Sequence, residues 1–263
     1  MRPGRVRAVA VLTLFVLLTF LLAPLQALLV RFAPGAAGRL GCAYWRCVAR
    51  LIAIRVTITG APEPGGALIA ANHSSWLDIV VLGSIAPTVF VAKREVAGWP
   101  LFGLIARLGR TVFVDRARRS AVSGALEEIR ARLKAGDKVV LFAEGTSSDG
   151  NRVLPFRTSL MGAAEVTIDG RPAPVQPVTV AYRALYGIPL DRWRMPQIAW
   201  YGDMALWPHL LGALGLGPID AEAIFHPART MAEAGDRKAL AGSCEAAVRA
   251  GLTPPRPPAP PRA

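Results

Sequence analysis

Hydrophobic positions divide the chain into an apolar run near its start, a long middle part of short alternating segments, and a proline-rich end. In the middle part, β-branched runs predict strands at 67–71, 88–93, 111–116, 138–144, 175–182, 197–202 and 219–225. Helical periodicity predicts helices near 75–84, 99–108, 119–135, 159–166, 205–214 and 236–250. This alternation predicts an α/β fold with a mixed, largely parallel sheet flanked by helices.

The apolar run at 8–30 contains no charged side chain and predicts a membrane-anchoring helical segment. A membrane span needs about 20 apolar residues. A secretory signal has a shorter core and a small-residue cleavage site, and no such site precedes Arg31. Pro24 and Gln26 interrupt the run, which fits a broken or re-entrant segment at least as well as a simple span.

The following stretch, 40–54, predicts a basic amphipathic helix. Arg46 and Arg50 lie four residues apart and therefore share one helical face. Such a helix fits the membrane interface, or it packs on the core with both arginines in water. We expect anchoring and amphipathic helices over 1–54, a catalytic α/β domain over 55–250, and a disordered proline-rich tail over 251–263.

Composition adds an unusual combination of charge and hydrophobicity. The 263 residues include 31 Lys+Arg against 18 Asp+Glu, a net charge of +13, yet 52% are hydrophobic. Nucleic-acid-binding proteins are basic but seldom so hydrophobic, whereas both properties suit an anionic membrane surface. Arginines flank the apolar run on both sides, which favours the inner membrane with the catalytic domain facing the cytoplasm. The three cysteines lack disulfide-framework or metal-site spacing and indicate free thiols in a reducing compartment.

The strongest candidate chemistry is the pair His73 and Asp78. On one continuous helix, residues five apart point about 140° away from each other. The two side chains can therefore meet only if His73 precedes the helix and Asp78 lies in its first turns. Asp78 would then fix the imidazole tautomer and leave the other nitrogen as a general base. Alternatively, Ser75 and Asp78 form an ordinary capping box and His73 is a loop histidine.

Four ordered segments resemble a known family. N-H-S-S-W-L-D at 72–78 is followed by T-V-F-V-D-R at 111–116, F-A-E-G-T-S at 142–147 and V-Q-P-V at 175–178. Together they resemble the sequence blocks of the 1-acylglycerol-3-phosphate acyltransferases, or lysophospholipid acyltransferases, over roughly residues 66–182. Two details depart from the family pattern. Ala143 replaces the usual proline, and Gly109 lies one residue further from Arg116 than usual.

The resemblance implies an O-acyltransferase that moves a fatty acyl group from acyl-CoA or acyl carrier protein to the hydroxyl of a membrane lyso-lipid. It implies no cofactor and no metal. Backbone N–H groups of the turn at 72–75 would stabilise the oxyanion, and the hydroxyls of Thr146 and Ser147 at the end of the third block can hold phosphate oxygens. The implied residues are His73 and Asp78 for catalysis and, for substrate binding, Arg116, Glu144, Gly145, Thr146 and Ser147.

The acceptor headgroup stays open between two lipids. The segments at 90–100, 146–152 and 200–203 resemble a bacterial branch that acylates lyso-ornithine lipid to ornithine lipid, whereas the commonest family acceptor is lysophosphatidate, which yields phosphatidate. A zwitterionic headgroup needs carboxylate and amine partners, and a phosphomonoester needs two or more cations. Lys93, in the first of these segments, either contacts the donor's phosphates or is structural.

Two other classes of function are less consistent with the sequence. A Ser–His–Asp esterase or thioesterase needs a nucleophilic serine on a sharp turn, and no G-x-S-x-G occurs. A non-enzymatic protein that binds anionic lipid or nucleic acid would explain the charge but not the four ordered segments, so we expect no nucleic-acid partner. His209 and His226 lie beside prolines and are expected in turns, without catalytic roles.

Overall fold

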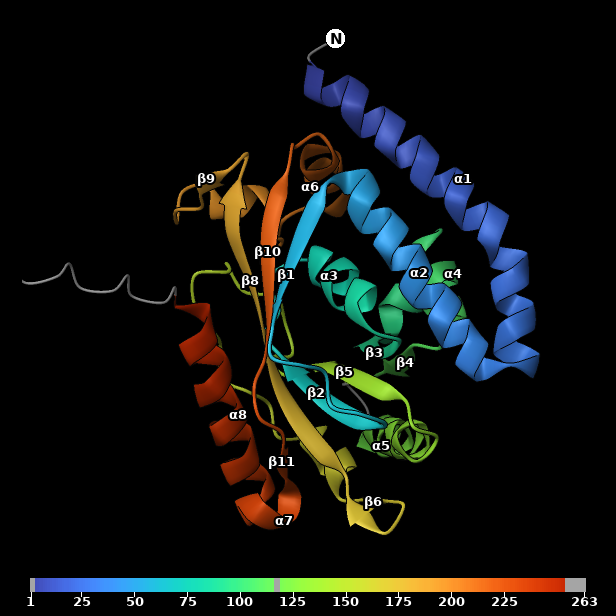
Figure 1. Cartoon of the computed structure of the whole chain (residues 1–263), viewed down its shortest axis with the longest axis vertical. Helices are drawn as coiled ribbons and strands as arrows, with labels where there is room; N and C mark the ends of the chain where they lie inside the picture. The colour runs from blue at the N-terminus through green and yellow to red at the C-terminus, as the bar shows by residue number, and fades with distance from the viewer. Residues whose placement is uncertain (1–2, 116–118, 254–263) are drawn as a thin grey trace, which may run out of the picture.

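The computed structural model describes residues 3–115 and 119–253, which form a central sheet with helices on both faces (Figure 1). The sheet has the strand order β1-β10-β8-β2-β5-β3-β4. Its strands are β1 (Ile54–Thr59), β2 (Ala67–Ala71), β3 (Thr88–Lys93), β4 (Val112–Val114), β5 (Lys138–Phe142), β8 (Pro174–Leu185) and β10 (Ile219–Phe225). The neighbours from β8 to β4 are all parallel, and β10 is antiparallel to β8. The predicted mixed, largely parallel sheet is confirmed.

Short strands complete the architecture. β9 (Ile188–Pro189) and β11 (Arg229–Thr230) pair with β8. β6 (Thr167–Ile168) and β7 (Arg171–Pro172) form a separate two-stranded sheet.

The two faces of the sheet are buried by different helices because successive strand residues point in opposite directions. Leu68 and Ala70 of β2 join one core cluster, and Ile69 and Ala71 join the other. The first cluster includes α5 (Arg119–Lys134) and α8 (Arg237–Leu252), which follows the short helix α7 (Met231–Ala234). The second cluster is covered by α1 (Pro3–Phe32), α2 (Pro34–Ile52), α3 (Leu77–Ile85) and α6 (Leu206–Leu214).

The two N-terminal helices form an antiparallel hairpin, with α1 as the outermost element (Figure 1). α1 continues through Pro24, so the segment is not broken within residues 8–30. Of the described helices, only this one is long and apolar enough to cross a membrane. Gln26 Nε2 donates to the carbonyl of Leu108 over 3.0 Å, which attaches α1 to α4 (Phe102–Leu108). The apolar helix is thus a candidate membrane anchor that also packs on the body of the protein.

The strand predicted at 197–202 is wrong. A 3₁₀ helix, η3 (Met195–Gln197), is followed there by irregular chain. The backbone of this segment bonds to the turn after β2 instead of a neighbouring strand. The Trp200 N–H donates to the Ser74 carbonyl over 2.8 Å, and the Ser75 hydroxyl donates to the Ile198 carbonyl over 2.6 Å. A tertiary contact therefore overrides a strand-like apolar pattern.

Three helix predictions also needed correction. The stretch at 159–166 forms only the 3₁₀ helix η2 (Met161–Ala164). The helix predicted at 99–108 begins at Phe102, as α4, and another 3₁₀ helix, η1 (Arg94–Gly98), precedes it. The helix predicted to reach residue 54 ends at Ile52, because Ala53 adopts a left-handed conformation with φ of 61°. Ile54 then begins β1, which pairs with β10. α8 continues to Leu252, and residues 254–263 of the predicted tail lie outside the described residues.

Candidate active site

The turn after β2 carries His73 and is fixed by its neighbour Asn72. The Asn72 side chain is buried; its Nδ2 donates to the Val180 carbonyl over 2.9 Å, and the Val180 N–H donates to its Oδ1 over 2.8 Å. This pair of hydrogen bonds joins the end of β2 to β8. His73 consequently leaves the sheet at the carboxyl ends of its parallel strands, where sites of α/β sheets lie.

His73 and Asp78 meet because α3 begins only at Leu77, after the turn. His73 Nδ1 lies 2.8 Å from Asp78 Oδ2. The same oxygen accepts the backbone N–H groups of Ser74 and Ser75 over 2.8 and 3.0 Å. A capping box would also need the Asp78 N–H to bond to the Ser75 hydroxyl, but it bonds to the Ser75 carbonyl over 3.0 Å, and α3 has no side-chain cap. The alternative of an ordinary capping box is therefore wrong, and Asp78 orients the imidazole and the turn before α3.

Tyr182 completes the surroundings of Asp78 and was not identified from the sequence. Its hydroxyl, on β8, donates to Asp78 Oδ1 over 2.7 Å. Burial, with the adjacent Asp78 charge, raises the pKa of Tyr182 well above its ordinary value, so the hydroxyl stays protonated. Asp78 is 0% exposed, and a buried carboxylate needs such donors. His73 Nε2 makes no hydrogen bond within the described residues and is free for substrate.

Phe142 supports the other side of the imidazole. Its ring, at the end of β5, stacks on His73 with centroids 4.0 Å apart and an interplanar angle of 17°. The His73 side chain is 19% exposed. The imidazole is thus held by a ring on one face and a carboxylate at Nδ1.

Glu144 lies on the interior side of the His73 turn, away from the cavity. Its Oε1 accepts the His73 N–H over 2.9 Å, and its Oε2 accepts the Leu154 N–H over 3.1 Å. Burial raises the pKa of Glu144 to about 7; the two hydrogen bonds oppose that rise, and the charges of Asp78 and Asp149 add to it. The side chain is 2% exposed and is not among the residues that line the cavity described below.

The other predicted binding residues divide into two groups. Gly145, Thr146 and Ser147 line the same cavity as His73. Gly145 has a φ of 76°, a conformation suited to glycine, which turns the chain back past His73. Arg116 lies outside the described residues.

The predicted oxyanion donors at 72–75 are already engaged. The N–H of His73 bonds to Glu144, and the N–H groups of Ser74 and Ser75 bond to Asp78. By contrast, the N–H groups of Thr146 and Ser147 have no backbone or side-chain acceptor in the described part of the chain. Donors for an oxyanion are therefore available beside the predicted turn, where the Ser148 N–H donates to the His73 carbonyl over 2.8 Å.

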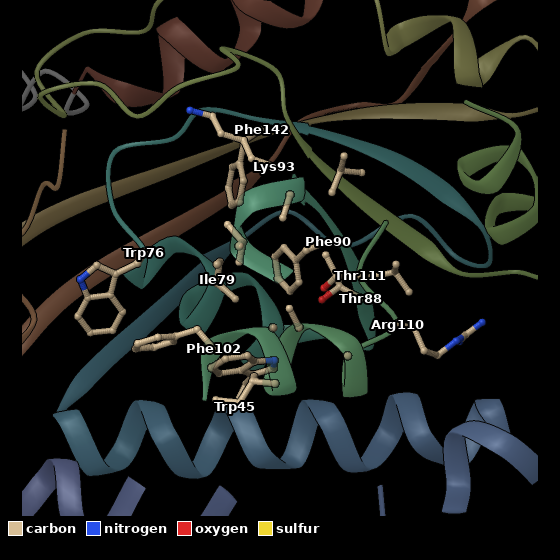
Figure 2. Close-up of a pocket in the computed structure, with 18 of the residues that line it drawn as sticks. Trp45, Trp76, Ile79, Thr88, Phe90, Lys93, Phe102, Arg110, Thr111 and Phe142 are labelled. Atoms are coloured by element: carbon tan, nitrogen blue, oxygen red, sulfur yellow. The ribbon is translucent and has the colours of Figure 1, made fainter. Parts of the chain in front are cut away.

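The site opens into an apolar cavity of about 590 Å³ (Figure 2). Phe142 and Lys93 lie together at one end, next to the catalytic turn, while Trp45 and Phe102 lie beside α2. Phe90 projects between these groups. The cavity therefore extends from the His73 imidazole into a space between the sheet, α4 and the α2 helix. Such a shape suits a long apolar chain whose reactive end lies at His73.

The remaining histidines lie outside the cavity wall. The prediction of a turn at His209 is wrong. His209 is buried within α6, where its Nδ1 accepts the Trp76 Nε1–H over 3.3 Å. Burial lowers the pKa of His209 and of His226. Within residues 3–115 and 119–253, no group of three His, Cys, Asp or Glu side chains is placed to hold a metal ion. Cys42, Cys47 and Cys244 are free thiols, as predicted.

Comparison with known proteins gives the family. A family model described as Acyltransferase matches residues 53–181. Lyso-ornithine lipid O-acyltransferase of Brucella abortus (strain 2308) is 46% identical over 254 residues, which cover 95% of each chain. The chain belongs to the acyltransferase family. This acyltransferase is also 33% identical to 1-acyl-sn-glycerol-3-phosphate acyltransferase of Neisseria gonorrhoeae, over 72% of its own length and 71% of the relative.

The fold of the acyltransferase agrees with a solved structure. It matches the crystal structure of the 1-acyl-sn-glycerophosphate acyltransferase of Thermotoga maritima with a TM-score of 0.67 and 21% sequence identity, over 95% of this chain and 96% of that one. The family resemblance seen in the ordered sequence segments is confirmed, and so is the implied class of enzyme.

Proposed function

We propose that this acyltransferase moves a fatty acyl group from a thioester, acyl-CoA or acyl carrier protein, to the free hydroxyl of a membrane lyso-lipid. The observation that carries the proposal is the His73–Asp78 contact of 2.8 Å, with Nε2 free at the end of an apolar cavity. Lyso-ornithine lipid and lysophosphatidate are the acceptors named for similar proteins. The donor's chain would occupy the cavity.

The reaction needs no acyl-enzyme. His73 Nε2 takes the acceptor's hydroxyl proton while that oxygen attacks the thioester carbonyl carbon, and Asp78 stabilises the imidazolium that forms. The carbonyl oxygen gains negative charge, which the N–H groups and hydroxyls of Thr146 and Ser147 would stabilise. When the C–S bond breaks, the sulfur leaves and receives the proton from the imidazolium. One ester and one thiol result from one thioester and one alcohol.

Hydrolysis by a nucleophilic serine has little support from the geometry. Ser74 and Ser75, the serines nearest His73 in sequence, are 1% and 0% exposed. The Ser75 hydroxyl already donates to the Ile198 carbonyl. The acceptor's own hydroxyl is therefore the better nucleophile.

The membrane is the proposed location of this chemistry. Apolar residues of α1 that face away from the body are largely exposed, among them Leu17 (60%), Phe20 (59%) and Leu21 (75%). The opposite side of α1 bonds to the body at both ends, since Arg7 donates to the Leu214 carbonyl and Gln26 to that of Leu108. A helix attached to the body near both ends, with an exposed apolar face, is placed to anchor that body at the bilayer. We propose the inner membrane, with the body on the cytoplasmic side.

The test is acyl transfer by purified full-length protein in detergent micelles, with acyl-CoA and acyl carrier protein as donors and both lyso-lipids as acceptors. His73→Ala and Asp78→Asn are expected to lower kcat at least about 100-fold. His226→Gln, a histidine away from the cavity, serves as the matched control, and circular dichroism checks folding. Near-native transfer by folded His73→Ala would exclude this mechanism.

A further inference from the structure

Two segments about a hundred residues apart in sequence meet beside the catalytic turn. Trp99 and Trp200 both line the cavity, and their ring centroids lie 6.3 Å apart at an interplanar angle of 77°. The Trp200 N–H bonds to the Ser74 carbonyl over 2.8 Å, and Trp200 Nε1 donates to the Met204 carbonyl over 2.7 Å. These bonds hold an aromatic wall within one residue of His73. Tyr201 also lines the cavity at this place.

The charges of the cavity wall are balanced. Among the described residues, the charged side chains on this wall are Lys93, Glu95, Arg110 and Asp137. Arg110 and Asp137 neutralise each other in a two-bond ion pair, with contacts of 2.7 and 2.9 Å. Lys93 and Glu95 make no ion pair with any described residue, and both are exposed. Within the part of the chain that the structure describes, the cavity wall thus offers one cation and one anion that ligands can use.

We infer that this wall is a binding site for a primary ammonium group in the acceptor's headgroup, formed by Glu95, Trp99 and Trp200. Aromatic ring faces and a carboxylate together are the environment that binds alkylammonium cations. Lys93, two residues from Glu95, is then placed to bind a carboxylate of the same headgroup. A zwitterionic amino-acid headgroup has both charges, and the inference rests on the proposed function because it concerns the acceptor of that reaction.

A phosphomonoester fits this wall less well. It carries almost two negative charges near neutral pH, whereas Lys93 is the wall's one described cation outside the Arg110–Asp137 pair. Its dianion would also face the Glu95 carboxylate. The Glu95 carboxylate therefore favours lyso-ornithine lipid over lysophosphatidate by charge.

The experiment compares three acceptors with the same acyl-CoA donor and full-length protein in detergent micelles. The acceptors are lyso-ornithine lipid, the same lipid acetylated on its free amine, and lysophosphatidate. Acetylation removes the positive charge and leaves the carboxylate, the free hydroxyl and the single fatty chain unchanged. The wild type is expected to lose about tenfold in kcat/KM on acetylation of the acceptor, with lysophosphatidate as poor a substrate as the acetylated lipid.

Substitutions in the proposed site then test which side chains cause the loss of kcat/KM on acetylation. Glu95→Gln and Trp99→Leu are expected to lower kcat/KM for lyso-ornithine lipid about tenfold and to leave kcat/KM for the acetylated lipid within about twofold. The matched controls are Glu128→Gln and Trp193→Leu, which change a glutamate and a tryptophan outside the cavity wall and should leave both values unchanged.

Failure of the inference differs from failure of the proposed function. If the wild type acylates the free and acetylated lipids equally, or prefers lysophosphatidate, the ammonium site is excluded while acyl transfer stands. If it acylates none of the three acceptors, the proposed function and the inference fall together. The acetylated acceptor keeps the test valid even if a tryptophan variant does not fold.

Discussion

Asp78 shows how a single residue determines the geometry of the site. Its carboxylate accepts hydrogen bonds from the Tyr182 hydroxyl, from His73 Nδ1 and from the two serine N–H groups of the turn. Because the two serine N–H groups belong to the turn and the Tyr182 ring is buried, these donors give the carboxylate one orientation. The fixed carboxylate in turn holds the imidazole in one orientation, so the ring is pre-organised for proton transfer.

Tyr182→Phe removes one of these donors without changing the shape of the ring. Hydrogen bonds to charged groups contribute about 1.5–3 kcal/mol, so we expect kcat to fall about tenfold or more while KM changes less than about twofold. Tyr186→Phe, on an exposed tyrosine, is the control. Steady-state kinetics measure the split, and a loss confined to KM would contradict a positioning role for Tyr182.

Glu144 predicts a pH dependence of stability. Its pKa of about 7 in the folded chain exceeds the ordinary value of 4.5. Between these pH values the folded state binds more protons than the unfolded state, so the free energy of unfolding falls as pH rises, by about 3 kcal/mol at most. Urea unfolding at about pH 5 and about pH 8 measures this slope.

The substitution Glu144→Gln should flatten that slope, since glutamine does not titrate. It is also expected to lower stability at low pH, because an amide offers one oxygen for two backbone donors. Glu128→Gln, at a surface glutamate paired with Arg132, should keep the wild-type slope. An unchanged slope in Glu144→Gln would assign the pH dependence to other groups.

At the scale of elements, the contact between α2 and α3 forms a wall of the cavity. Gly83 of α3 lies directly under the Trp45 ring of α2, and a Cβ at Gly83 would lie 2.5 Å from the nearest atom of that ring. Trp45 also lines the cavity, so its ring position depends on the absence of a side chain at Gly83. The packing of two helices thus decides how much room an acyl chain has.

Gly83→Ala should therefore act on both stability and chain length. Overpacking of this kind costs about 1–3 kcal/mol, and the displaced ring should shift preference toward shorter acyl-CoA donors. Gly124→Ala, in α5, meets nothing within 4 Å and should stabilise by about 0.5–1 kcal/mol. Thermal unfolding and a series of donor chain lengths measure the two effects. Unaltered chain-length preference in a destabilised variant would exclude Trp45 as a cavity wall.

At the scale of the whole molecule, the chain combines a folded enzyme body with an exposed apolar helix. α1 runs along one side of the protein and α2 packs beneath it (Figure 1). The cavity is lined by residues of α2 and of the strands β3 and β5. A bilayer that covers α1 would therefore lie close to the space proposed for the acyl chain. The net charge of +13 adds attraction to anionic lipid.

The double substitution Leu17→Ser and Leu21→Ser tests this arrangement. Burial of each leucine in lipid contributes about 1.5–3 kcal/mol, so flotation with phosphatidylglycerol vesicles should fall at least about tenfold. Activity in detergent micelles should persist, since neither residue lines the cavity. Ile58→Ser, on β1, is the control at an exposed apolar residue elsewhere. Undiminished flotation would show that α1 is not the anchor.

Prediction from the sequence succeeded where the signal was local. The β-branched runs at 67–71, 88–93 and 219–225 became β2, β3 and β10 with the predicted bounds. It failed at 197–202, where an equally apolar run bonds to the turn of His73 instead of a strand. β-propensity is a property of the segment alone. It does not determine which part of the protein will accept or donate the segment's backbone hydrogen bonds.

The candidate site shows the same division. The five-residue spacing of His73 and Asp78 left two roles for Asp78 open, and the structure shows the contact with His73 but no complete capping box. Tyr182 lies 104 residues from Asp78, and no sequence pattern connected the two. Glu144, expected near the headgroup, turned inward because the backbone behind it supplies two N–H donors.

The sequence by itself determined the alternation of strands and helices, the apolar helix, and the reactive pair, because each depends on residues close together along the chain. Only the tertiary structure decided which donors hold Asp78, which walls enclose the cavity, and that Trp99 meets Trp200 beside His73. The order of strands sets these neighbours, and that order results from burying both faces of one sheet at once.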